Sequence, residues 1–282
     1  MALSLGTVAV LQARAGLVQS SVEDAGRPAG RPTLADAQRL FYNARYEEAA
    51  ALALALRSSE TEDLANDELR TSALLFQLKA LLEGPADKGV DKVDKEDALR
   101  SCATCGALVA AFLEDLHHGQ TLARARLQAN PDDETALFFL GKLDLNYVWL
   151  ELGTLGRRTG WDEYREARRS LDAVLHAHPQ HVRALVARGW IDYIVSTRMP
   201  WGTRWLFGGG NRKRALKMVR DATLLPSDVF SHAEAEFALW DMLVREGDLT
   251  EAAEVARRLA HDFPANRELA AYLEAREAPP RR

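Results

Sequence analysis

The chain has 282 residues, 47% of them hydrophobic and 27% charged, which is typical of a soluble folded protein. Its 36 basic and 41 acidic residues give a formal net charge of −5, so it lacks the basic excess of a general nucleic-acid binder. Helix-favouring Ala, Leu, Arg and Glu are abundant, and β-branched runs with a period of two are absent. No stretch approaches the ~20 apolar residues of a membrane span. We therefore expect an all-α protein without a transmembrane segment.

The N-terminal segment, residues 1–32, is predicted to precede the folded domain. An apolar run from Leu3 to Leu11 is followed by Gln-Ala-Arg-Ala, which is similar to the end of a secretory signal, although no basic residue precedes the run. If residues 1–15 are a truncated signal peptide, the protein is periplasmic or secreted; if they are a frayed helix, it is cytoplasmic. Residues 20–32 contain two Gly-Arg-Pro triplets, which predict a flexible linker.

Apolar periodicity predicts the helices of the remaining chain. They are expected over residues 33–44, 47–58, 62–83, 107–129, 133–158, 161–177, 181–197, 211–224, 229–246, 250–262 and 266–277. The stretch 84–97 is charged and contains Gly and Pro, so we predict a loop there. Asp132, Asn211 and Asp228 are predicted N-caps, because short polar side chains accept hydrogen bonds from a first helical turn.

The two cysteines lie in Cys102-Ala103-Thr104-Cys105. Three interpretations remain: reduced structural thiols, a disulfide if the protein is exported, and a redox or metal site. The last is the least favoured. One such pair cannot complete a four-ligand zinc site, and a thioredoxin-like site needs a βαβ unit that the sequence lacks. We therefore predict no metal and no cofactor.

Four prolines, Pro131, Pro179, Pro226 and Pro264, each end a helix-like run. Proline cannot continue a helix, so it ends each run at an equivalent place. The successive spacings of 48, 47 and 38 residues are typical of repeated helical hairpins.

The last repeat, Gly247-Asp248-Leu249-Thr250-Glu251-Ala252-Ala253 closed by Pro264, resembles a tetratricopeptide repeat (TPR). The segment Asn43–Ala49 carries the same turn. In the middle units, Gly141 and Gly189 match the first helix of the motif, but each is followed by about 14 more residues than a TPR has before the next helix.

This resemblance implies a right-handed α-solenoid of stacked antiparallel helical hairpins over residues 33–277, with a disordered tail over 278–282. In TPR proteins, ligands meet the inner face of the first helices. Carried over to this chain, the groove candidates are Phe138, Lys142, Asn146, Arg183, Trp190, Tyr193, Phe237 and Asp241. The alternative is that the extra residues tilt these helices and bury the same side chains.

An aromatic insertion between residues 197 and 211 supplies candidates for a docking loop. They are Trp201, Arg204, Trp205 and Phe207. Because aromatic side chains usually bury, the favoured alternative is that they pack against the neighbouring hairpin. Gly208-Gly209-Gly210 does not predict a phosphate site, since no strand precedes it and the P-loop spacing is absent.

No catalytic residue is predicted, because the chain contains no HExxH or G-x-S-x-G motif. The resemblance implies a scaffold that binds a protein segment or a small ligand, of bacterial type. One alternative is a substrate-handling accessory of a transport system, such as the TPR-like T-component of TRAP transporters, although no motif is specific to that family. The other is an enzyme with a pocket between the long helices. The sequence identifies neither the partner nor the oligomeric state.

Overall fold

The computed structural model describes residues 31–57, 60–83, 95–157, 159–198 and 210–277. The predicted signal segment and the predicted C-terminal tail lie outside these residues. The chain divides into two units, Met1–Pro32 and Thr33–Arg282, and the described helices all belong to the second. All regular structure in the described residues is helical, which confirms the all-α expectation. The helices are α1 (Leu34–Tyr42), α2 (Tyr46–Ala55), α3 (Glu60–Glu83), α4 (Lys95–Ser101), α5 (Cys105–Ala129), α6 (Glu134–Val148), the π-helix η2 (Trp149–Thr154), α7 (Trp161–Ala177), α8 (Val182–Arg198), α9 (Arg212–Ala222), α10 (Val229–Glu246), α11 (Leu249–Asp262) and α12 (Arg267–Glu277).

Side-chain caps explain where several helices begin. Asn211 and Asp228 accept hydrogen bonds from backbone N–H groups in the first turns of α9 and α10, as predicted. At α6 the cap is Asp133 instead of Asp132. Arg126 holds the Asp133 carboxylate with two hydrogen bonds of 2.9 and 3.0 Å, which fixes it at the helix start. Among these helices, none combines the length and apolar character needed to cross a lipid bilayer.

Two other predicted boundaries are wrong. The charged stretch 84–97 was expected to be a loop throughout, but α4 begins at Lys95. Its acidic first turn suits a helix start, since carboxylates stabilise the N-terminal end of the helix dipole. The single helix expected over 133–158 changes to a π-helix at Trp149, and its last helical residue is Thr154. Gly156, with φ of +71°, then turns the chain towards α7.

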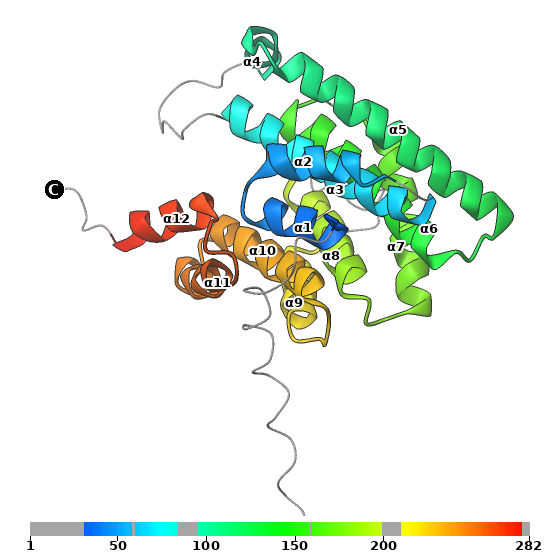
Figure 1. Cartoon of the computed structure of the whole chain (residues 1–282). Coiled ribbons are helices and arrows are strands. Elements are labelled where there is room, and N and C mark those ends of the chain that lie inside the picture. The colour runs from blue at the N-terminus through cyan, green and yellow to red at the C-terminus, as the bar shows by residue number, and fades with distance from the viewer. Residues whose placement is uncertain (1–30, 58–59, 84–94, 158, 199–209, 278–282) are drawn as a thin grey trace, which may run out of the picture. The chain divides into compact units, whose positions relative to one another are not determined.

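Helices pack in pairs that follow one another along the chain. The pairs are α1–α2, α3–α5, α6–α7, α8–α9 and α10–α11. The first members of successive pairs also pack on one another, α1 on α3, α3 on α6, α6 on α8 and α8 on α10 (Figure 1). In addition α1 contacts α10, so the first and last pairs meet. We call α1, α3, α6, α8 and α10 the first helices.

Close helix approach explains the glycines at Gly141 in α6 and Gly189 in α8. A Cβ atom on Gly141 would lie 2.8 Å from Leu171 Cγ and 3.3 Å from the carbonyl oxygen of Ala167. A Cβ atom on Gly189 would lie 2.8 Å from Val219 Cγ2. Real Cβ atoms do not approach this closely, so only glycine lets the two helices of each pair come together here.

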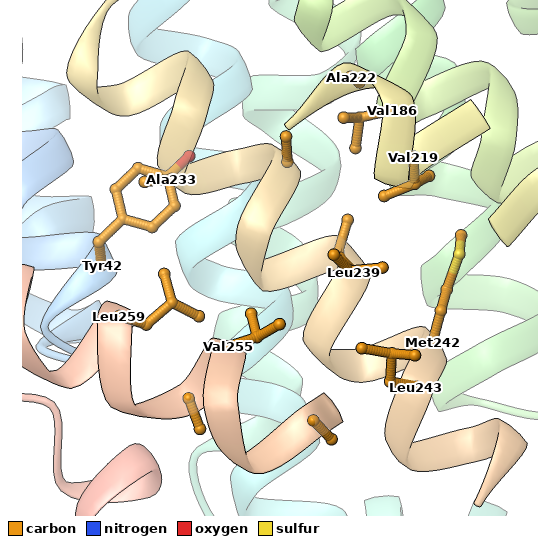
Figure 2. Close-up of a cluster of buried hydrophobic side chains, with 14 of the residues drawn as sticks. Tyr42, Val186, Val219, Ala222, Ala233, Leu239, Met242, Leu243, Val255 and Leu259 are labelled. Carbon is orange, nitrogen blue, oxygen red and sulfur yellow. The ribbon is translucent and has the colours of Figure 1, made fainter. Parts of the chain in front are cut away.

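A buried apolar cluster joins α1 to the C-terminal pairs. Figure 2 shows Tyr42 beside Ala233 of α10 and Leu259 of α11, in the same buried cluster as Leu239. The Tyr42 ring centroid is 5.5 Å from that of Phe237 and 5.3 Å from that of Phe263. Aromatic contacts of this kind stabilise a core beyond simple area burial. This cluster therefore holds the first and last helix pairs together.

Candidate functional site

Four charged side chains from α3, α6, α8 and α10 meet where the first helices pack together. We call Glu68, Lys142, Arg183 and Glu234 the inner charge cluster. Lys142 Nζ lies 2.5 Å from Glu234 Oε1 and 3.4 Å from Glu68 Oε1. Arg183 Nε donates to Glu234 Oε2 at 2.5 Å, and its Nη2 donates to Glu68 Oε2 at 2.9 Å. Two cations and two carboxylates therefore neutralise one another.

The cluster is largely removed from water, with side chains between 6% and 18% exposed. Burial by itself disfavours an ionised Glu234, but the charges of Arg183 and Lys142 outweigh it and lower the pKa of Glu234 to about 2. Burial likewise opposes the charge of Arg183, and the Glu234 and Glu68 carboxylates outweigh it and raise the pKa of Arg183. Glu234 and Arg183 therefore each stabilise the ionised form of the other.

Two further groove candidates lie against this cluster. The Phe138 ring is 5.0 Å from the guanidinium carbon of Arg183, a cation–π contact. Asn146 Nδ2 donates to Thr71 Oγ1 and to Ser72 Oγ, both at 3.0 Å. The structure therefore brings Phe138, Lys142, Asn146 and Arg183 together. The polar groups of the last three are already bound to side chains of α3 and α10.

The other groove candidates on α8 and α10 lie in two different places. Phe237 stacks on Tyr42 in the buried apolar cluster. Trp190 and Tyr193 form an edge-to-face pair with centroids 5.6 Å apart. The Tyr193 hydroxyl donates to Glu246 Oε1 at 2.8 Å, and burial together with this carboxylate raises the pKa of Tyr193 to about 12.

Trp190 also belongs to a more open arrangement, which we call the aromatic surface: Trp149, Trp190, Asp241 and Arg245. The half-buried Trp149 and Trp190 rings meet edge to face at 5.4 Å. The Arg245 guanidinium carbon lies 5.9 Å from the Trp190 centroid, and Arg245 Nε donates to Asp241 Oδ1 at 2.9 Å. Apolar rings beside partly exposed charges are a common composition for a binding surface.

Sequence reasoning missed Glu68, Trp149 and Arg245. The segment containing Glu68 carries no recognisable repeat motif, so nothing linked it to Lys142 or Arg183. Trp149 follows Lys142 by seven residues on one predicted helix, a spacing that already placed both on the same face. That periodicity was the one available signal.

Comparison with protein families, curated proteins and solved structures finds no match. The resemblance to TPR proteins therefore rests on the residues of this chain alone.

A second buried charged cluster joins α3 and α5 to Arg57, which follows the end of α2. Asp67 and Asp115 are fully buried. Arg57 pairs with both carboxylates, Arg70 pairs with Asp115, and His118 Nδ1 lies 2.6 Å from Asp67 Oδ2. Each carboxylate is already shared between two partners, so this cluster serves to connect the helices.

A polar pocket of about 370 Å³ lies between α5 and α7. It is lined by Arg124, Asp162, Glu163, Arg165, Glu166 and Arg169. The nearby Asp144 of α6 is fully buried and accepts from Gln120 Nε2 at 2.7 Å. Burial and the Glu166 carboxyl raise the pKa of Asp144 to about 8, so it is mostly protonated at neutral pH. Because Asp144 has no exposure, it cannot act on a substrate in the pocket.

Of the remaining sequence candidates, Trp201, Arg204, Trp205 and Phe207 lie outside the described residues. Cys102 and Cys105 are joined by a disulfide. Within the described ranges, no three His, Cys, Asp or Glu side chains are placed to hold a metal ion together.

Proposed function

We propose that the chain is a TPR-like scaffold, a right-handed α-solenoid of antiparallel helical hairpins, that binds a partner. Two observations support the architecture. Each first helix packs on its own partner and on the next first helix, the contact order of a repeat stack. Gly141 and Gly189 also make equivalent close approaches to the following helix.

The ligand, a protein segment or a small molecule, is proposed to bind at the aromatic surface. The main observation is the difference in exposure between the two groups of groove candidates. The inner charge cluster is closed, because its four charges are paired and shielded. Trp149 and Trp190 are half-buried and border Asp241 and Arg245, which are 38% and 36% exposed. Aromatic anchors next to accessible charges supply both contact area and orientation.

The test uses a random peptide library displayed on phage and a panel of small organic ligands, each measured against purified protein. We expect ligands whose affinity falls at least about tenfold in Trp190→Ala, since a buried aromatic anchor is commonly worth about 2 kcal/mol or more. Leu249→Ala is the control, because this side chain on α11 is 36% exposed and lies outside the aromatic surface.

Circular dichroism would establish that both variants are folded. Enrichment of peptides would show that the ligand is a protein segment. Binding of small molecules alone would show that the ligand is a small molecule. Selected ligands that bind Trp190→Ala as tightly as wild type would refute the aromatic surface as the site. A screen without any binder would refute the scaffold function itself.

A further inference from the structure

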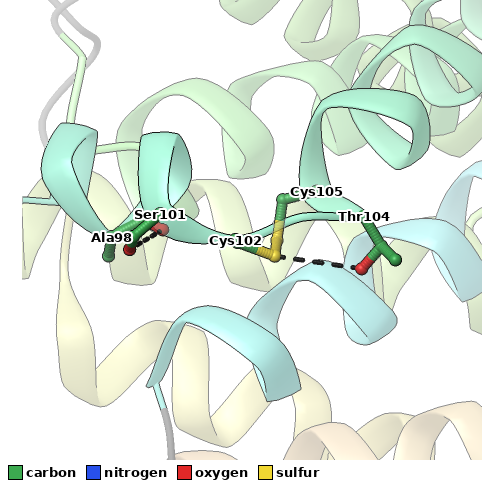
Figure 3. Close-up of a disulfide and its surroundings, with 5 residues drawn as sticks. All are labelled: Ala98, Ser101, Cys102, Thr104 and Cys105. Atoms are coloured by element: carbon green, nitrogen blue, oxygen red, sulfur yellow. Dashed lines mark hydrogen bonds between the residues drawn. A yellow bond between two sulfur atoms is a disulfide. The ribbon is translucent and has the colours of Figure 1, made fainter.

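The Cys102–Cys105 disulfide lies at the corner between α4 and α5 (Figure 3). Cys105 is the first residue of α5 and is fully buried, whereas Cys102 is partly exposed just after α4. The two sulfur atoms of this bond therefore differ in accessibility. An incoming nucleophile can reach only the Cys102 side of the bond without unfolding the helix.

Small residues leave room around the accessible sulfur. Ser101, Ala103, Thr104 and Gly106 are all exposed. A Cβ atom added to Gly106 would meet no other atom within 4 Å, so the surface beside the disulfide is open. Thr104 Oγ1 lies 3.9 Å from Cys102 Sγ, so a polypeptide that approaches this sulfur does so beside the exposed Thr104 side chain.

The buried sulfur is suited to leave as a thiolate. Cys105 begins a 25-residue helix whose capping residue, Thr104, makes no side-chain hydrogen bond to the first turn. The positive end of the helix dipole lies at this position, where it stabilises negative charge on a leaving sulfur. The disulfide closes a loop with only two residues between the cysteines. It therefore constrains the unfolded chain less than a long-range disulfide would and contributes little to the stability of the fold.

We propose that this pair is a thiol–disulfide exchange site whose substrate is a dithiol on another polypeptide. One substrate thiolate attacks Cys102 Sγ; the Cys102–Cys105 bond breaks, a mixed disulfide forms, and Cys105 leaves as a thiolate. The second substrate thiolate attacks the substrate sulfur of the mixed disulfide and releases Cys102. The substrate loses two electrons and becomes a disulfide, and its two protons end on Cys102 and Cys105. This inference is independent of the proposed scaffold function.

The test uses the full chain with dithiothreitol as the dithiol probe, thiol alkylation to trap the products, and circular dichroism to follow the fold. We expect reduction of the disulfide while the helical signal is unchanged. The single-cysteine variants then identify the attacked sulfur. In Cys105→Ser, the Cys102 thiol should react with an aromatic disulfide reagent at least about tenfold faster than the buried Cys105 thiol does in Cys102→Ser.

Reduction only after loss of the helical signal would overturn the proposal and make the disulfide purely structural. Equal reactivity of the two folded variants would overturn the assignment of Cys102 as the attacked atom. If one variant does not fold, alkylation mapping of the wild-type mixed disulfide with glutathione decides the question. Glutathione on Cys102 supports the assignment, and glutathione on Cys105 contradicts it.

Discussion

Replacing Gly141 with alanine tests the close pairing of α6 and α7. The new Cβ atom would lie 2.8 Å from Leu171 Cγ and 3.1 Å from its Cδ2. Leu171 is fully buried, and its Cγ is a branch point that cannot swing aside, so the helices must separate. Overpacking of this kind costs about 1–3 kcal/mol. Alanine recovers up to about 1 kcal/mol through its higher helix propensity.

The expected net result is a loss of about 1–2 kcal/mol in the free energy of unfolding, with a Tm lower by roughly 2–8 °C for a domain of this size. Gly106→Ala is the matched control, because its Cβ atom meets nothing within 4 Å. That variant should be as stable as wild type or slightly more stable. Chemical denaturation and thermal unfolding, both followed by circular dichroism, measure the two changes.

A Gly141→Ala variant as stable as wild type would refute the close approach of the two helices. A double-mutant cycle sharpens the result, because residues in contact are energetically coupled. Leu171→Ala removes the atoms that the new Cβ meets. It should therefore cost less in the Gly141→Ala background than in wild type.

Two further predictions concern buried carboxyl groups. Asp144 has a folded pKa of about 8 against an ordinary value near 3.8, so the unfolding free energy should fall as the pH rises from about 4 to about 8. In Asp144→Asn the unfolding free energy should fall less steeply with rising pH. If chemical denaturation at several pH values gave the same pH dependence for wild type and variant, the raised pKa of Asp144 would be contradicted. Glu234 has the opposite shift, to about 2, so its contribution is complete above about pH 4.5 and is lost as the pH falls towards 2. Glu234→Gln should cost about 3–5 kcal/mol at neutral pH, because it leaves two buried cations with one carboxylate; a loss below about 1 kcal/mol would show that the inner charge cluster is hydrated.

The helices themselves were largely predictable from the sequence. Apolar periodicity, the closing prolines and caps such as Asn211 act within a few residues, so their effects are local. The errors fell where local rules conflict. A charged stretch that looks like a loop can also begin a helix, as α4 does at Lys95, and a π-helix at Trp149 has no distinct composition.

The sequence by itself determined the helical class, the equivalent positions of Gly141 and Gly189 and which side chains lie on the first helices. Only the tertiary structure decided what those side chains do. Glu68 and Arg183 are 115 residues apart, and their ion pair depends on how successive helix pairs turn relative to one another. The packing of α1 on α10 likewise joins helices from opposite ends of the described chain, while Trp149 and Trp190 stay half-buried. No local pattern encodes these contacts, because the way helices pack is set by side chains from residues distant in the chain.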